Sequence, residues 1–373
     1  MKSFLIVISL IFSTSLFAER NVLLIFPKLE NLSLTGQLVM SGIEASFDQF
    51  PQAKDELDLI KLETGSNLKE LASELEKAIS KYKPLAIIGA ITSNSAFVIA
   101  DISERNKIPF ITPFATHSDV TKERKFTFRA CFDDSYQAEK LATFAVKNLK
   151  KSRIAVVYNS SSSYSLGIKS RFTPIATKSG AKVVAEIGVQ NSNNLLPEKI
   201  QQIKEANPDL ILIPSYQVEA ASIISKLGNV LPRTTTYLGP DSWGGGRLFH
   251  KVFQGDDIDF HGFYVQHLGG VQLEKRPEFK KILSEKNIFK DKSHQETVAM
   301  VAPVVIGYDS GTILFTAYQN SQREKIDLRA SIAKLDIVGI TGRLNFKSNN
   351  TPQKSLFIYK INKKDESFYE EYK

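Results

Sequence analysis

The stretch Pro84–Thr116 places the tightest limit on what this chain can fold into. It holds two short apolar runs, Leu85–Ile88 and Ile108–Ile111, on either side of a segment with helix-like character. Buried strands of four to eight residues that are joined through a helix are typical of parallel sheets. The stretch therefore predicts an α/β fold in which the carboxyl ends of these two strands lie side by side.

Small hydroxyl residues follow both apolar runs. Thr92, Ser93 and Ser95 follow the first run, and Thr112 and Thr116 follow the second. Ligands of open parallel sheets bind outside the carboxyl ends of the strands, and a helix that begins near Ser93 would offer free backbone N–H groups to a carboxylate. Two interpretations stay open at this point: a cradle for a small ligand with an anionic group, or residues that only cap helices.

The rest of the chain repeats this alternation of strands and helices in two series. The first series runs from a predicted strand at Asn21–Phe26 to another at Phe126–Arg129, and the second runs from a helix at Asp134–Leu149 to a strand at Thr235–Leu238. Two successive series indicate two α/β lobes, each with a mostly parallel sheet. The last part is less regular, and we expect there a strand that could serve as a crossing, a long buried helix, a short helix and a terminal hairpin. These segments are Phe260–Gln266, Val298–Asn320, Leu328–Leu335 and the hairpin strands Ile340–Phe346 and Ser355–Ile361.

The first eighteen residues, Met1–Ala18, have the pattern of a secretory signal. Lys2 precedes an apolar run that ends in small residues, so we expect cleavage after Ala18, with Ser15 as the alternative. No cysteine follows this run, so we do not expect a lipid anchor. No later apolar run is long enough to span a membrane without interruption. The chain is therefore predicted to be exported, with no membrane span after cleavage.

Composition narrows the class of protein further. Cys131 is the only cysteine of the 373 residues, so no internal disulfide can form and the core alone must stabilise the fold. A chain of this length can bury two cores. Cys131 has apolar neighbours, which makes it a poor nucleophile. The net charge of +8 comes from dispersed lysines without an arginine-rich run, so no nucleic acid partner is expected.

No catalytic or metal-binding pattern stands out. The five histidines fall in no motif of that kind, and His261 and His267 lie six residues apart without a cysteine partner, unlike zinc sites. Gly244–Gly246 does not belong to a phosphate-binding GxxxxGK pattern. We expect neither an enzyme nor a cofactor.

Seven short motifs follow one another along nearly the whole chain after the signal. They are IIGAITSNS (Ile87–Ser95), IPFITPFAT (Ile108–Thr116), FTFRACFDDSYQAEKLATFAV (Phe126–Val146), RIAVVYNSSSSYSLG (Arg153–Gly167), PDLILIPSY (Pro208–Tyr216), YLGPDSW (Tyr237–Trp243) and GITGRLNFKSN (Gly339–Asn349). Each is loose alone. Their order and spacing resemble those of the Leu/Ile/Val-binding family of type I periplasmic binding proteins, the extracytoplasmic receptors of amino-acid ABC importers.

This resemblance implies the type I periplasmic-binding-protein fold: two Rossmann-like lobes with parallel sheets, joined by three hinge crossings, with the ligand held in the cleft between them. The crossings would fall near Ala130–Asp133, Tyr264–His267 and Val338–Thr341. The implied domains are residues 19–131 plus 266–340 for the first lobe, and 132–265 plus 341–373 for the second lobe.

The resemblance also implies a ligand site. A substrate carboxylate would be bound by Ser93, the backbone of Phe114 and Thr116, and an α-amino group would meet Tyr216 and Asp241. Hydroxyls and amides suit a carboxylate, an acid suits an ammonium, and such charge-assisted contacts are stronger in a closed cleft than in water.

Several of these residues depart from the family or have simpler explanations. The resemblance assigns Tyr164 to the second-lobe wall, although Tyr164 and Tyr216 could be ordinary half-buried aromatic residues. Asp241 replaces a commoner glutamate and could instead be a turn or cap residue. Phe114 is larger than the usual residue, and its ring could narrow the pocket. Trp243 could be a cleft wall or part of a loop.

The predicted function is to bind a small amino acid or related polar metabolite and to deliver it to an ABC importer. Its partners would be that ligand and a permease in the inner membrane, and we expect a monomer. The alternative is a sensor or scaffold on the same fold that signals to a membrane or cell-wall partner, since a fold does not determine function. A hydrolase is a third class, and it would be revealed by cleavage of an amide or a peptide.

Overall fold

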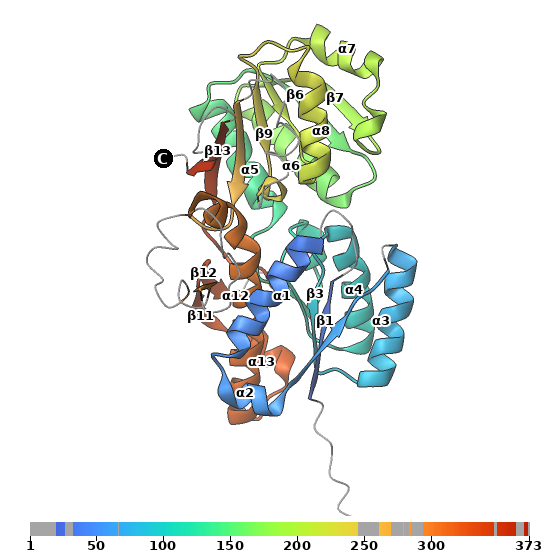
Figure 1. The fold of residues 1–373 in the computed structure, drawn as a ribbon, viewed down its shortest axis with the longest axis vertical. Helices are drawn as coiled ribbons and strands as arrows, with labels where there is room; N and C mark the ends of the chain where they lie inside the picture. Colours follow the sequence, from blue (N-terminus) through green and yellow to red (C-terminus); the bar gives the residue numbers. More distant parts are fainter. Residues whose placement is uncertain are drawn as a thin grey trace, which may run out of the picture.

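The computed structural model describes residues 20–26, 33–65, 67–244, 261–269, 279, 283–284, 294–346, 349–362 and 369–371. The predicted signal Met1–Ala18 lies outside the described residues. In the described part of the chain, no helix is long and apolar enough to cross a membrane. The described elements form two lobes, one above the other in Figure 1.

The first lobe is built on a five-stranded sheet in the order β2-β1-β3-β4-β5, with all strands parallel. Residues on both faces of β1 and β3 are buried, because helices cover both sides of the sheet. The predicted pairing of the two strands of the Pro84–Thr116 stretch is confirmed, with Ile87 opposite Phe110. The strands are β1 (Asn21–Ile25), β2 (Asp58–Leu62), β3 (Ala86–Gly89), β4 (Phe110–Thr112) and β5 (Thr127–Arg129).

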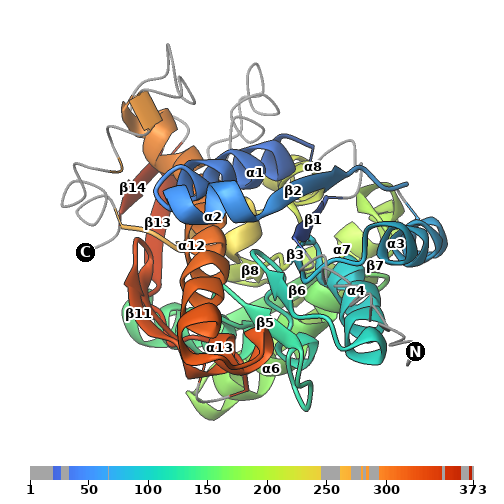
Figure 2. The same ribbon diagram turned by 90° about the horizontal axis from the view of Figure 1, so that it is seen from below.

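Six of the described helices belong to this lobe. Helices α1 and α12 pack on one face of the sheet and α3 and α4 on the other (Figure 2). The approach of α1 to α12 requires glycine, because a Cβ atom on Gly42 would lie 2.0 Å from the carbonyl oxygen of Val304. The helices are α1 (Ser33–Phe47), α2 (Pro51–Glu56), α3 (Leu68–Tyr82), α4 (Ser93–Asn106), α12 (His294–Glu324) and α13 (Leu328–Lys334).

The second lobe has a seven-stranded sheet in the order β14-β13-β10-β9-β8-β6-β7. Five neighbouring strands are parallel, and β13 and β14 add an antiparallel edge. The strands are β6 (Arg153–Asn159), β7 (Lys182–Val189), β8 (Leu210–Leu212), β9 (Thr236–Gly239), β10 (His261–Gln266), β13 (Phe357–Asn362) and β14 (Tyr369–Glu371). The helices are α5 (Asp134–Thr143), which continues as a π-helical turn, α6 (Ser163–Lys178), α7 (Pro197–Ala206) and α8 (Gln217–Gly228).

The predicted terminal hairpin is wrong. Strand β12 (Gly342–Asn345) pairs with the preceding β11 (Asp336–Gly339), whereas β13 pairs with β10. A two-residue turn joins β11 to β12, and Gly342 adopts a φ of +119°, which residues with a side chain rarely adopt. The sequence pattern identified the strands but not their partners, because the pairing of β13 depends on a strand about ninety residues away.

At the first two predicted crossings, the chain passes from the hydrophobic core of one lobe to that of the other. Ala130 packs in the core of the first lobe, and Phe132 packs in the second, so the chain crosses between them. Strand β10 ends at Gln266 in the second sheet, and Leu268 packs in the core of the first lobe. Both passages lie near the crossings that the family resemblance implies.

The third crossing is not at Val338–Thr341. Leu344 and Phe346 still pack in the core of the first lobe, while Leu356 packs against the second. The chain therefore crosses between Phe346 and Leu356. The domain boundaries stay a prediction, and we propose to move the last one from 340/341 to this later segment.

Candidate functional site

A small cavity of about 50 Å³ lies between the two lobes. Both lobes contribute to its wall, so a molecule bound there would contact both. The lining residues of the first lobe are Thr35, Ile91, Ser93, Phe114, Ala302 and Pro303, and those that pack with the second lobe are Tyr164, Tyr216, Asp241, Ser242, Gly244 and Gln266.

Ser93 lines the cavity at the start of α4, directly after β3. The cap of this helix is Thr92, whose hydroxyl accepts a hydrogen bond from the backbone N–H of Ser95 at 3.2 Å. The Ser93 hydroxyl oxygen accepts from the backbone N–H of His117 at 3.3 Å. Thr92 therefore caps the helix, while its neighbour Ser93 lines the cavity. The Ser93 hydroxyl can still donate its proton.

The loop after β4 contributes Phe114 to the cavity wall but not Thr116. The Thr116 side chain is buried behind the wall, and its carbonyl accepts from the backbone N–H of Asp134 at 2.7 Å. The Phe114 ring packs edge-on against the His267 imidazole, with 5.3 Å between the ring centres. Five of the six predicted site residues therefore line one cavity, and their contact with a ligand stays a prediction.

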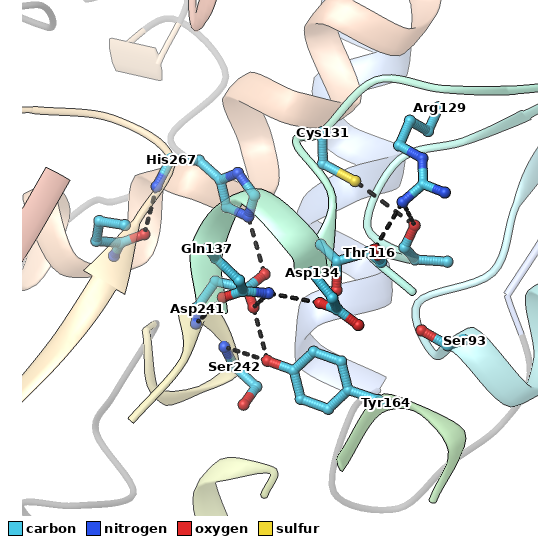
Figure 3. Close-up of polar contacts among 12 residues, drawn as sticks. Ser93, Thr116, Arg129, Cys131, Asp134, Gln137, Tyr164, Asp241, Ser242 and His267 are labelled. Carbon is cyan, nitrogen blue, oxygen red and sulfur yellow. Dashed lines mark hydrogen bonds and ion pairs between the residues drawn. The ribbon is translucent and has the colours of Figure 1, made fainter. Parts of the chain in front are cut away.

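Asp241 is the centre of a buried polar network (Figure 3). Its Oδ1 accepts from the Tyr164 hydroxyl at 2.6 Å and from Gln137 Nε2 at 3.1 Å. Its Oδ2 lies 2.9 Å from His267 Nε2. The cap residue of the short helix Asp241–Trp243 is Pro240, and Asp241 is the first residue within the helix, so Asp241 is not its cap.

The His267 imidazole is fully enclosed, and burial lowers its pKa below the ordinary value although Asp241 opposes the shift. It therefore stays neutral at neutral pH and donates from Nε2 to Asp241. Its ring stacks on Phe132 at 3.9 Å and 19°. His267 Nδ1 has no hydrogen-bond partner among the described residues. A neutral histidine leaves Asp241 without a cationic partner among those residues.

A second acid, Asp134, lies beside this network. Gln137 Nε2 donates to Asp134 Oδ1 at 2.6 Å and so bridges the two carboxyl groups. Burial, reinforced by the charge of Asp241, raises the pKa of Asp134 to about 8. Asp134 is therefore mostly protonated at neutral pH, and the two acids do not carry two full charges side by side.

This proton makes stability depend on pH. Because the folded state retains the Asp134 proton that the unfolded chain loses near pH 4, stability should fall as pH rises toward 8, by up to about 1.4 kcal/mol per pH unit. Asp134→Asn should remove this slope in urea unfolding at pH 5 to 8. Asp133→Asn is the matched control, since Asp133 caps α5 and asparagine caps equally well. Equal slopes in the wild-type protein and Asp134→Asn would refute the assignment.

Two tyrosines complete the second-lobe wall. The rings of Tyr164 and Tyr216 stack at 5.3 Å and 19°, and burial raises the pKa of both phenols, so they remain neutral donors. The Tyr216 hydroxyl lies beside the Ser93 backbone, and Asn94 Oδ1 accepts from the Ser163 hydroxyl at 2.6 Å. Contacts of this kind join the two lobes at the cavity.

Several residues of the site were not found from the sequence. Gln137, His267, Gln266 and Ser242 belong to motifs or crossings that were recognised, but nothing local marked their side chains. Trp243 is buried, and its Nε1 donates to the Ile213 carbonyl at 3.1 Å, so it is a core residue that supports the site. Cys131 is buried, which raises its pKa to about 12 and agrees with its predicted inertness as a nucleophile.

Two α/β lobes with parallel sheets and a cavity between them are the architecture of the type I periplasmic binding proteins. The profile of the periplasmic binding protein family matches residues 23–266, and the chain belongs to this family.

Individual relatives are similar over different lengths. The Leu/Ile/Val-binding protein BraC3 of Rhizobium johnstonii is 26% identical over 63% of this chain and 65% of its own length, so the match spans less than two thirds of that relative. The crystal structure of the leucine binding protein LivK of Thermotoga maritima has a TM-score of 0.80 at 26% identity, over 95% of this chain and 97% of that one. A benzoate-bound solute binding protein of Rhodopseudomonas palustris has a TM-score of 0.77 at 15% identity over 94% and 95% of the two chains, which shows the shared fold alone.

Proposed function

We propose that this chain is an extracytoplasmic solute-binding protein that captures a small amino acid or a related polar metabolite and delivers it to an ABC importer. The observation that carries the proposal is the composition of the cavity. Ser93 and Phe114 form one wall from the first lobe, and Tyr164, Tyr216 and Asp241 form the opposite wall.

The first-lobe wall suits a carboxylate. The Ser93 hydroxyl can donate into the cavity, because its oxygen already accepts from His117. Among the described residues, the backbone N–H groups of Phe114 and Thr116 donate to no acceptor. Hydroxyl and amide donors that converge at the end of a sheet are a good match for an anionic group.

The second-lobe wall suits an ammonium. Asp241 is buried, and its neighbours Tyr164, Gln137 and His267 are neutral donors that hold it without cancelling its charge. A buried carboxylate is costly without a cation, and a ligand ammonium would supply one. The stacked tyrosine rings and Phe114 would cover the apolar part of the ligand.

Closure follows from this division of the site. A zwitterion can contact the donors of one lobe and the acid of the other only when the lobes are together, so ligand shifts the hinge equilibrium to the closed state. We further propose that Met1–Ala18 directs the chain to the periplasm, that a monomer is the active form, and that an inner-membrane permease is its partner.

A thermal-shift screen of the mature protein tests this function. Amino acids, their amides, ureas and benzoates are compared, and an amino acid should raise the melting temperature most, since a ligand that binds only the folded state stabilises it by mass action. Calorimetry then measures the affinity, and mass spectrometry of the ligand should show no turnover. A benzoate that outperforms every amino acid, or cleavage of an amide, would contradict the proposal.

A further inference from the structure

One buried arginine organises the loop on which the anion-binding wall depends. Arg129 is the last residue of β5 and is completely buried. Its Nη1 donates to the carbonyls of Ala115 at 3.2 Å and Thr116 at 2.7 Å. Its Nη2 donates to the carbonyls of His117 at 2.8 Å and Ser118 at 3.3 Å. Four consecutive carbonyl groups thus converge on one guanidinium (Figure 3 shows it above Thr116).

Arg129 binds the carbonyl groups of residues 115–118, and in this way it fixes the orientation of the backbone N–H groups of the same loop. His117, whose carbonyl Arg129 holds, donates its N–H to Ser93 and so frees the Ser93 proton for the cavity. The Thr116 hydroxyl is buried beside Asp134 without a hydrogen-bond partner of normal geometry among the described residues. The Ser93 hydroxyl lines the cavity and keeps its proton free, so it is the donor of this group that a ligand anion would satisfy.

The charge of Arg129 is as informative as its geometry. A guanidinium keeps its positive charge in proteins, and none of the described carboxylates forms an ion pair with Arg129. Among the described residues, the hydrogen-bond acceptors of Arg129 are the four carbonyl groups and the Thr121 hydroxyl, at 3.1 Å. The charge acts on its surroundings, since it favours the ionised form of Asp134 and disfavours the imidazolium of His117. Because Arg129 is buried away from water, its charge is screened far less than it would be in solution.

We propose that Arg129 is a positioning residue for the anionic group of the ligand: it holds residues 115–118 in the donor-presenting shape and supplies an unpaired positive charge behind them. This inference rests on the proposed function and deepens it, because it makes the anionic group, and not only the apolar side chain of the ligand, a determinant of specificity.

The test uses Arg129→Gln and Arg129→Lys, with Arg124→Gln as the matched control. Arg124 also donates to carbonyls of this segment, those of Asp119 and Val120, but it pairs with the exposed Asp101. Calorimetry compares L-leucine with L-leucinamide, which lacks the carboxylate charge. Arg129→Gln should weaken the binding of L-leucine about tenfold or more, and that of L-leucinamide much less. The affinity of Arg129→Lys for L-leucine should lie between those of the wild-type protein and Arg129→Gln. The affinities of Arg124→Gln for both ligands should equal those of the wild-type protein.

Amide hydrogen exchange provides a readout that needs no ligand. Backbone amides of residues 114–118 should exchange faster in both Arg129 variants, and not in Arg124→Gln. If Arg129→Gln does not fold, both calorimetry and hydrogen exchange are measured on Arg129→Lys. Lysine keeps the positive charge but lacks the two NH2 groups with which the guanidinium binds the four carbonyl groups. If the wild-type protein binds neither L-leucine nor L-leucinamide, the proposed function fails for these two ligands. Amide hydrogen exchange then tests by itself whether Arg129 holds the loop. Unchanged exchange in the Arg129 variants, or equal losses for acid and amide, overturns the inference.

Discussion

Replacing Asp309 by asparagine should lower the free energy of unfolding by about 3–5 kcal/mol, because the change leaves a buried lysine without its countercharge. Asp309 lies within α12, and its Oδ2 is 3.4 Å from Lys354 Nζ, with both side chains almost completely buried. Asp309 also accepts from the backbone N–H groups of Ile340 at 2.7 Å and Thr341 at 3.0 Å. One carboxylate therefore joins α12, the β11–β12 turn and the third crossing.

The effect should depend on pH. Burial lowers the pKa of Lys354, and Asp309 opposes this shift, so the variant would lower it further. A lysine whose pKa is lower in the folded state destabilises the fold when it is charged, and this penalty shrinks as pH rises toward the unfolded value. Urea unfolding of Asp309→Asn at pH 7 and pH 9.5 should therefore show a smaller loss at the higher pH.

Two controls separate the ion pair from general damage to α12. The double variant Asp309→Asn with Lys354→Met should recover much of the loss, since it removes both charges. Asp336→Asn breaks a pair with Arg343 at 2.5 Å whose arginine is mostly exposed, and it should have an effect below about 1 kcal/mol. A loss in Asp309→Asn no larger than in Asp336→Asn would argue against a stabilising role of this cluster.

The sequence was sufficient for the elements with strong periodicity. The apolar run of β1 and the helical spacing of Leu71 and Leu75 in α3 specify local structure whatever the rest of the chain does. Asn67 caps α3 by accepting from the N–H of Glu70 at 2.9 Å. Such signals act within a few residues, so a single sequence shows them.

The partners of the C-terminal strands could not be read in this way. Strand β13 has the composition of a hairpin strand, but its hydrogen bonds go to β10, because the third crossing has already carried the chain to the other lobe. The buried Lys354 in this crossing also gives no local sign of its partner, since Asp309 is 45 residues away. Tertiary contacts at this distance decide both cases.

The residues of the candidate site also fall into those that the sequence indicated and those that depend on tertiary contacts. The resemblance directed attention to five residues that line the cavity, while Thr116 lies behind its wall. Gln137 and His267 were missed because they contact Asp241 across 104 and 26 residues of sequence. A motif states which residue types recur, whereas the hydrogen bonds around Asp241 exist only after the lobes and crossings have come together.

Asp241→Asn should weaken the binding of an amine-bearing ligand more than tenfold, from the loss of about 2 kcal/mol or more that is typical of a buried charge pair. Asparagine preserves the shape of the network. Its oxygen can still accept from Tyr164 and Gln137, and its amide can donate to His267, whose unpartnered Nδ1 can take the ring proton. The substitution therefore tests the charge of Asp241, whereas Asp241→Ala, for which we also expect more than a tenfold loss, would in addition leave three donors without an acceptor.

The measurement compares L-leucine with 4-methylpentanoate, which has the same carbon skeleton and carboxylate but no amine. The wild-type protein should prefer L-leucine, and Asp241→Asn should reduce this preference, because only the amine interacts with the lost charge. Glu219→Gln is the matched control: Glu219 is a half-buried acid of the second lobe that accepts from Asn159 at 3.0 Å and does not line the cavity. An unchanged preference in Asp241→Asn would mean that the acid only holds Tyr164 and His267 in place, and the ammonium would have to be bound elsewhere.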